Sequence, residues 1–130
     1  MNNNFDNSSI LLLEDVFNKE QNIPKELMQI KSENQKWWCI KSNDEVVGIV
    51  AAWEINSEWH LGRLAIHKKL RGFGFGNELT KKALEELFRI GIEKVRIDAR
   101  DIAVKIVLKQ GGIKIGRRVN FYGPITPMEI

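Results

Sequence analysis

The spacing of apolar residues changes along this chain, and each change predicts a new element. Near the start, helical spacing predicts one helix from Ile10 to about Lys19 and a second, short helix at 24–30, which Pro24 can open. Apolar segments separated by short polar turns then predict three strands, at 36–41, 45–54 and 59–67. Turns this short join only antiparallel neighbours, so we expect an antiparallel meander.

A helical pattern returns in the second half of the chain. Apolar residues between Leu79 and Phe88 recur at helical spacing, and Gly91 ends this predicted helix. The segment 94–100 alternates apolar and charged residues, which predicts a strand with one solvated or ligand-facing side. A strand, a helix and a strand in succession favour a right-handed crossover, so this strand should lie parallel to the strand at 59–67.

The last predicted elements are a helix and a closing strand. Asp101 can cap a helix that runs to Lys109, and the glycines at 111–112 break it. The segment from Ile113 to Val119 then predicts the closing strand. The predicted fold class is therefore α+β, a single domain over residues 1–130 in which a mixed sheet carries helices on both faces.

The composition is that of an ordinary globular protein. Of 130 residues, 43% are hydrophobic and 28% charged, which argues against wholesale disorder. No apolar run approaches the roughly 20 residues of a membrane span, and the polar segment Met1–Ser9 lacks the blocks of a signal peptide. We expect a cytoplasmic protein with no membrane partner. The single cysteine, Cys39, cannot form an internal disulfide or a cysteine zinc cage, so we expect it to be buried and expect no metal site.

The charge is divided unevenly between the two halves of the chain. Residues 1–62 carry ten acids and five lysines, a balance of −5, and residues 63–130 carry fifteen basic and seven acidic residues, a balance of +8. The two sum to the net charge of +3. This asymmetry suggests an anionic ligand at one end and a cationic acceptor at the other, although scattered surface charge explains it equally well. We expect no nucleic-acid partner, because only Phe73 and Phe75 interleave aromatic rings with the basic charges.

The strongest chemical signal is the glycine-rich loop Arg71–Gly76. It lacks the Gly-Lys-Ser/Thr ending of a P-loop, and its glycines do not have the spacing of the dinucleotide fingerprint. A basic glycine turn before an amphipathic helix presents backbone N–H groups and a helix N-terminus to an anion. Glu78 is the only acid between 63 and 82, a segment that carries six basic residues: Arg63, Lys68, Lys69, Arg71, Lys81 and Lys82. The loop predicts a site for a ligand with several phosphates; the alternative is a turn that merely reverses the chain.

The same loop carries a family resemblance. The pattern Leu64-Ala65-Ile66-x-x-x-x-Arg71-x-x-Gly74-x-Gly76-x-x-Leu79 resembles the acetyl-CoA signature of the GNAT superfamily, and the segments 16–26 and 62–66 are similar to its ElaA-like branch. The resemblance covers roughly residues 12–113. It implies the GNAT fold, in which the sheet opens around acetyl-CoA between the strands at 59–67 and 94–100.

The resemblance also implies an activity and a set of site residues. The activity is N-acetyl transfer from acetyl-CoA to a primary amine, in a small molecule or a peptide, by direct attack on the thioester; the chain could act as a homodimer. The pantetheine arm would pair with the main chain of Leu64 and Ile66, and the pyrophosphate would rest on the loop. The implied cofactor-binding residues are Leu64, Ala65, Ile66, Arg71, Gly72, Phe73, Gly74, Phe75, Gly76, Asn77 and Asp101.

The general base is expected on the strand before the loop. In several GNAT enzymes it lies six residues before the residue that matches Ile66, which here is His60. Strand alternation puts His60, Gly62, Leu64 and Ile66 on one face, unless a bulge at Gly62 changes the parity. Histidine titrates near neutral pH and suits this role, although a lone histidine is often merely part of the packing. Glu58 and Glu54 are the rival bases, or they bind a cationic acceptor.

The general acid is missing from its usual place. The family's helix tyrosine would fall at position 108, which is Leu108, and Tyr122 is the only tyrosine in the chain. Water or Tyr122 could replace the acid. The alternative function is a GNAT-fold protein that binds or senses CoA without turnover.

Overall fold

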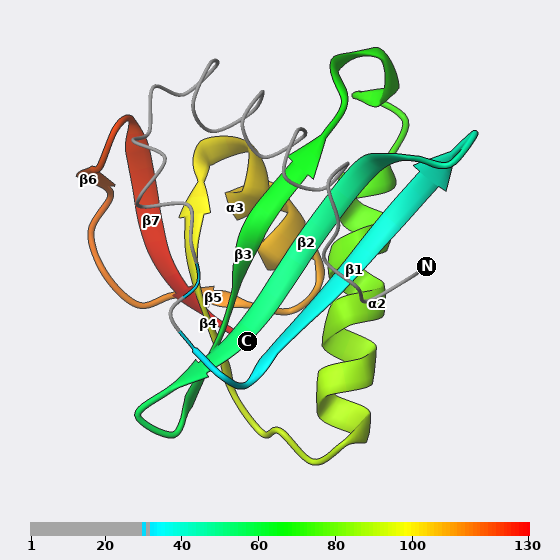
Figure 1. The fold of residues 1–130 in the computed structure, drawn as a ribbon. Coiled ribbons are helices and arrows are strands. Elements are labelled where there is room, and N and C mark those ends of the chain that lie inside the picture. The colour runs from blue at the N-terminus through cyan, green and yellow to red at the C-terminus, as the bar shows by residue number, and fades with distance from the viewer. Residues whose placement is uncertain (1–29, 31) are drawn as a thin grey trace.

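The computed structural model describes residue 30 and residues 32–130, and its described strands all belong to one mixed sheet (Figure 1). The strand order is β1-β2-β3-β4-β7-β5, and β6 pairs with β7. The strands are β1 Gln35–Ser42, β2 Glu45–Ile55, β3 Glu58–Ile66, β4 Val95–Arg100, β5 Ile113–Lys114, β6 Val119–Asn120 and β7 Pro124–Glu129. The predicted helices at 10–19 and 24–30 lie, apart from Ile30, outside the described residues.

The first three strands form the predicted antiparallel meander. Two-residue turns join them, Asn43-Asp44 between β1 and β2 and Asn56-Ser57 between β2 and β3. All four turn residues have positive φ, as the tight turns that match strand twist require, and asparagine, aspartate and serine tolerate it at modest cost. The polar turns seen in the sequence therefore determine both hairpins.

The helix pattern also proves correct. Helix α2, Phe75–Arg89, follows the glycine loop, and α3, Asp101–Lys109, follows β4. Both helices pack on the same face of the sheet, α2 against β1, β2 and β3 and α3 against β4 and β7 (Figure 1). Asp101 is the first residue of α3 and does not cap it: the cap position is Arg100, and none of the described side chains makes a cap hydrogen bond there.

Strand β4 joins the sheet as expected, parallel to β3. Their register has only two pairs, Trp59 with Val95 and His60 with Arg96, so the two strands separate beyond that point. On its other edge β4 pairs along its length with β7 in the antiparallel direction. The central pair of strands is thus joined at one end and open at the other.

The closing strand differs from the prediction. The segment Ile113–Val119 forms only the two-residue β5 and the start of β6, and the long terminal strand is β7. Two prolines in six residues conceal β7, because proline removes a donor from the ladder. On one edge, β7 pairs first with β6, through Pro124 and Ile125, and then with β5, through Met128 and Glu129. Pro127 lies in the gap between these two ladders.

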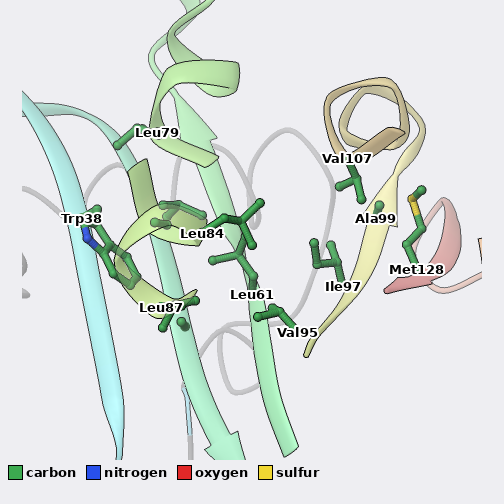
Figure 2. Close-up of a cluster of buried hydrophobic side chains, with 13 residues drawn as sticks. Trp38, Leu61, Leu79, Leu84, Leu87, Val95, Ile97, Ala99, Val107 and Met128 are labelled. Carbon is green, nitrogen blue, oxygen red and sulfur yellow. The ribbon is translucent and has the colours of Figure 1, made fainter. Parts of the chain in front are cut away.

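Two clusters of buried apolar side chains lie on opposite faces of the sheet. The main core cluster lies on the helix face, and Figure 2 shows residues of α2 and α3 directed at the strands. Its members are Trp38, Val50, Ala52, Leu61, Leu79, Ala83, Leu84, Leu87, Val95, Ile97, Ala99, Val107 and Met128. The second core cluster comprises Trp37, Cys39, Val46, Ile49, Ala51 and Ala65, alternate positions of the same strands. Cys39 is buried, as predicted.

Candidate active site

A β-bulge interrupts β3 where it begins to separate from β4. Ile49 of β2 pairs with Ala65, but Ala51 pairs with Gly62, so β3 uses one extra residue between these two pairs. Arg63, inside the bulge, has φ of 57°, in the left-handed region that is unusual for a residue with a large side chain.

The bulge reverses the alternation of side chains along β3. Leu61 belongs to the main core cluster, and Leu64 and Ile66 pack against the same cluster although they lie three and five residues further on. Ala65 belongs to the second cluster on the other face. In an unbroken strand Leu61 and Ala65 would share a face, because they are four residues apart. They lie on opposite faces here, so the alternation of side chains is reversed once between them.

His60 therefore lies on the face away from the helices. Its ring stacks on Trp53, which packs against the second core cluster, and a Cβ built on Gly62 also points at Trp53. The expectation that His60 and Gly62 share a face with Leu64 and Ile66 is wrong, because the bulge at Arg63, next to the suspected Gly62, changes the parity.

A cavity of about 240 Å³ occupies the opening between β3 and β4. Its lining comes from both faces of the sheet: Val50 and Val107 belong to the main core, whereas Trp53 and His60 lie on the opposite side. The opening passes through the sheet, so His60 reaches the cavity despite the change of parity. Phe121, which precedes β7, is also part of the lining.

Three side chains order the β3 wall of this cavity. The Trp53 and His60 rings have centroids 5.9 Å apart and planes 9° apart, and the Arg63 guanidinium lies 5.2 Å from the centroid of the same indole. Gly62 makes room for them, because a Cβ there would lie 2.8 Å from Trp53 Cη2. Burial lowers the pKa of Arg63.

Arg100 orders the opposite wall. Its Nη1 donates hydrogen bonds to the carbonyls of Phe121 at 2.6 Å, Tyr122 at 3.3 Å and Gly123 at 3.0 Å. This guanidinium holds the turn before β7 and so fixes the backbone that carries the Phe121 ring. Desolvation by burial lowers the pKa of Arg100.

The glycine loop has the geometry of an anion site. Gly72 and Gly74 have φ of 86° and 83°, and a Cβ on either would meet no atom within 4 Å, so the loop faces open space. Gly74 is the N-cap of α2, and no described side chain caps this helix end. The first N–H groups of α2 and its dipole are therefore presented to the exterior.

The loop is tied back to β3 by Arg71, whose Nε donates to the Ile66 carbonyl at 2.9 Å. That carbonyl, expected to pair with a pantetheine arm, thus already accepts one hydrogen bond. Phe73 is 72% exposed and lies 6.4 Å, centroid to centroid, from the Phe75 ring. Gly76 sits in the first turn of α2, where a Cβ would touch Ile106 of α3 at 3.4 Å.

A comparison with protein-family models identifies the family of this chain. The model of the acetyltransferase (GNAT) family matches residues 8–111, most of the chain. This chain belongs to the GNAT family. No curated protein sequence matches it significantly.

Solved structures give the GNAT fold independently. The protein is similar to Escherichia coli ElaA, with TM-score 0.85 and 22% identity, covering 94% of this chain and 87% of that one. An acyl-CoA N-acyltransferase from Pseudomonas aeruginosa gives TM-score 0.82 and 17% identity over the same shares. An aminoglycoside 6′-N-acetyltransferase in complex with coenzyme A gives 0.74 and 16%, over 95% of this chain and 88% of that one.

Two residues predicted to bind the cofactor, Asp101 and Asn77, make contacts with other side chains. Asp101 is exposed, and its two carboxylate oxygens accept from Arg118 at 3.0 and 2.7 Å, a pair that lowers the pKa of Asp101. Asn77 Oδ1 accepts from Gln110 Nε2 at 2.9 Å, which links α2 to α3. Neither Asp101 nor Asn77 lines the cavity.

The rival acid and base candidates are also outside the described lining of the cavity. Glu58 is exposed at the start of β3, and Glu54 accepts from Asn34 Nδ2 at 2.9 Å. Leu108, at the tyrosine position of the family, is 45% exposed. Tyr122 does not line the cavity, but its ring packs edge-on against Phe121, which does, at 5.0 Å between centroids.

Sequence reasoning missed Trp53, Arg96 and Phe121 as cavity residues. The alternation of 94–100 was the available signal for Arg96, since it marked one side of that strand as solvated or ligand-facing. Trp53 and Phe121 have no comparable local signal, because the register of β2 and the course of the chain before β7 bring them to the cavity.

Two further observations concern the described part of the chain. Its histidine, cysteine, aspartate and glutamate side chains form no group of three that could hold a metal ion. None of the described helices is long and apolar enough to span a membrane.

Proposed function

We propose that this protein is an N-acetyltransferase that moves the acetyl group of acetyl-CoA to a primary amine. One observation carries the proposal: the cavity between β3 and β4 lies on the strand that leads directly into the open glycine loop. An elongated ligand could then rest its phosphates on the loop and its reactive end in the cavity. We further propose that residues 1–130 act as one domain.

The loop supports the fit of the donor. Its left-handed glycines leave open space, no side chain among the described residues caps the N-terminus of α2, and Lys68 and Lys69 are exposed beside it. These groups suit the pyrophosphate and 3′-phosphate of CoA. The main chain of β3 beyond the bulge, from Leu64 to Ile66, would align the arm.

His60 is the proposed base. It would accept the proton that the amine loses when its nitrogen forms the new C–N bond and the C–S bond of the thioester breaks. The proton on the free CoA thiol would come from water, since Leu108 has no acidic proton and Tyr122 does not line the cavity. Trp53 would keep the imidazole at the cavity edge by stacking on it.

The test is release of the CoA thiol from acetyl-CoA in the presence of a panel of amines. We expect amine-dependent release above hydrolysis, together with the acetylated amine in equal amount. The second candidate function is CoA binding without turnover, which Leu108 at the tyrosine position favours. CoA binding by calorimetry without thiol release on any amine would select that second function.

A further inference from the structure

The charged side chains that line the cavity are mostly arginines. Among the described residues the lining includes Arg63 of β3 and Arg96 and Arg100 of β4, and Asp98 is its one acid. This excess of positive charge lies around the proposed base and not at the glycine loop. It therefore belongs to the part of the cavity where an acceptor would bind.

Two of these arginines make contacts that shape the walls of the cavity. Arg63 stacks over Trp53, and Arg100 holds three successive carbonyls before β7. Their guanidinium groups shape the walls and contribute a positive field. Both guanidinium groups therefore already contact other parts of the protein.

Arg96 differs from both. Its Nε is fully shielded from solvent and has no hydrogen-bond partner among residue 30 and residues 32–130. A guanidinium donates through five N–H groups in one plane, and a buried donor without an acceptor is costly. Arg96 is also the register partner of His60, so its side chain stands beside the proposed base.

Asp98 follows on the same side of β4. Val95, Ile97 and Ala99 are buried in the main core, so the alternate residues Arg96 and Asp98 point to the other face. One face of β4 therefore carries Arg96, which can bind a carboxylate, and then Asp98, which can bind an ammonium. Arg96 is the residue that pairs with His60.

We infer that the acceptor is a small amine that also carries a carboxylate, as an amino acid does, and that Arg96 binds this carboxylate as a specificity-determining residue. The two Nη groups at the end of the planar fork match a carboxylate with two parallel hydrogen bonds, and the shielded Nε stays inside the wall of the cavity. Asp98 receives the ammonium before deprotonation, and His60 takes the proton. The inference rests on the proposed acetyl transfer, because only a transferase has an acceptor. It replaces the cationic acceptor that the charge asymmetry of the sequence suggested. The charges that line the cavity act directly on an acceptor, whereas the net charge of half the chain is mostly spread over distant surface.

The first experiment needs no turnover. Binding of N-acetyl-L-phenylalanine and of its C-terminal amide to the CoA-loaded protein is measured by calorimetry. We expect the acid to bind about tenfold more tightly or better, the scale of a charge-assisted hydrogen-bond pair. Arg96→Gln should abolish that preference, Arg96→Lys should retain part of it, and Arg117→Gln, an exposed arginine outside the cavity, should leave it unchanged.

The second experiment compares kcat/KM for L-phenylalanine and L-phenylalaninamide. The ratio of kcat/KM for the acid to that for the amide should fall about tenfold in Arg96→Gln relative to wild type. The different basicities of the two amines cancel when the ratios of the two proteins are compared. Equal binding of acid and amide, or an unchanged ratio in Arg96→Gln, overturns the inference. So does a loss of CoA affinity in Arg96→Gln, which would assign Arg96 to the donor. If the acid is preferred but no amine is acetylated, the carboxylate site stands and the proposed acetyl transfer fails.

Discussion

Trp53 of β2 and His60 of β3 stack across the sheet, with ring centroids 5.9 Å apart and planes within 9° of parallel. They are register partners in the β2–β3 ladder, and the residue two positions along β3 is Gly62, whose lack of a Cβ admits the indole. The stack fixes the plane in which the imidazole can exchange a proton at the edge of the cavity. It also makes the geometry of His60 depend on Gly62, whose missing side chain leaves room for the indole.

We predict that Gly62→Ala displaces Trp53, because the added methyl would lie 2.8 Å from Cη2. Overpacking of this kind costs about 1–3 kcal/mol of unfolding free energy. Turnover should fall while CoA affinity is kept, as read by chemical denaturation, kinetics and calorimetry. In a Trp53→Phe background, where Cη2 is gone, the same change should cost much less; equal costs in the two backgrounds would remove the glycine–indole contact as the cause.

For the proposed base, His60→Ala should lower kcat by about a hundredfold or more without changing CoA affinity. The matched control is His67→Asn, since His67 Nδ1 accepts from the Lys69 N–H at 3.2 Å and asparagine can take over that bond. If the control loses as much turnover as His60→Ala, the base lies elsewhere.

The glycine loop gives a prediction about donor binding. Gly74→Asp should abolish measurable CoA binding, because it puts a carboxylate at the N-terminus of α2 where a phosphate is expected. Gly91→Asp is the control: it lies past the other end of α2, has φ of 100° and has no neighbour within 4 Å of a Cβ. Calorimetry should show binding in the control and none at Gly74, with both proteins folded by circular dichroism. Retained affinity at Gly74 would refute the loop as the phosphate site.

The exposed lysines of the 3₁₀ turn Lys68–Leu70 should select for the 3′-phosphate. We expect CoA to bind more tightly than dephospho-CoA at low salt, and the difference to shrink as salt screens exposed charges. Replacing Lys68 and Lys69 by glutamine should reduce the difference, whereas Lys114→Gln, on β5, should not. Equal affinities of wild type for the two ligands would exclude this role.

The pair of Asp101 and Arg118 gives a prediction about pH. The hydrogen bond from Arg118 lowers the pKa of Asp101 in the folded protein, so the pair stabilises the fold above the unfolded-state pKa and loses that effect as pH falls through the folded one. Arg118→Gln should raise the pKa of Asp101 towards its ordinary value, measured by carbon NMR of the carboxyl group. Arg117→Gln serves as the neighbouring control. An unchanged pKa in Arg118→Gln would mean that the pair does not persist in solution.

Local pattern determined much of this protein. Strands β1 to β4 and helices α2 and α3 follow from spacing alone, and the two hairpins follow from Asn43-Asp44 and Asn56-Ser57. These features depend on residues close in sequence, whose side-chain period and turn conformations do not need the rest of the chain. The open geometry of the glycine loop belongs to the same class, because Gly72 and Gly74 carry the positive φ themselves.

Tertiary structure alone decided the rest. The bulge at Arg63 lies where β3 still pairs with β2 on one edge but no longer with β4 on the other, and only that register shows that His60 and Leu64 face opposite ways. Strand β7 forms despite two prolines because β4 pairs along its length and β5 and β6 leave a break at Pro127. The pairing of Asp101 with Arg118 and the position of Arg96 beside His60 likewise join distant segments. Such contacts are selected by the total free energy of one packed sheet, which no local window of the sequence contains.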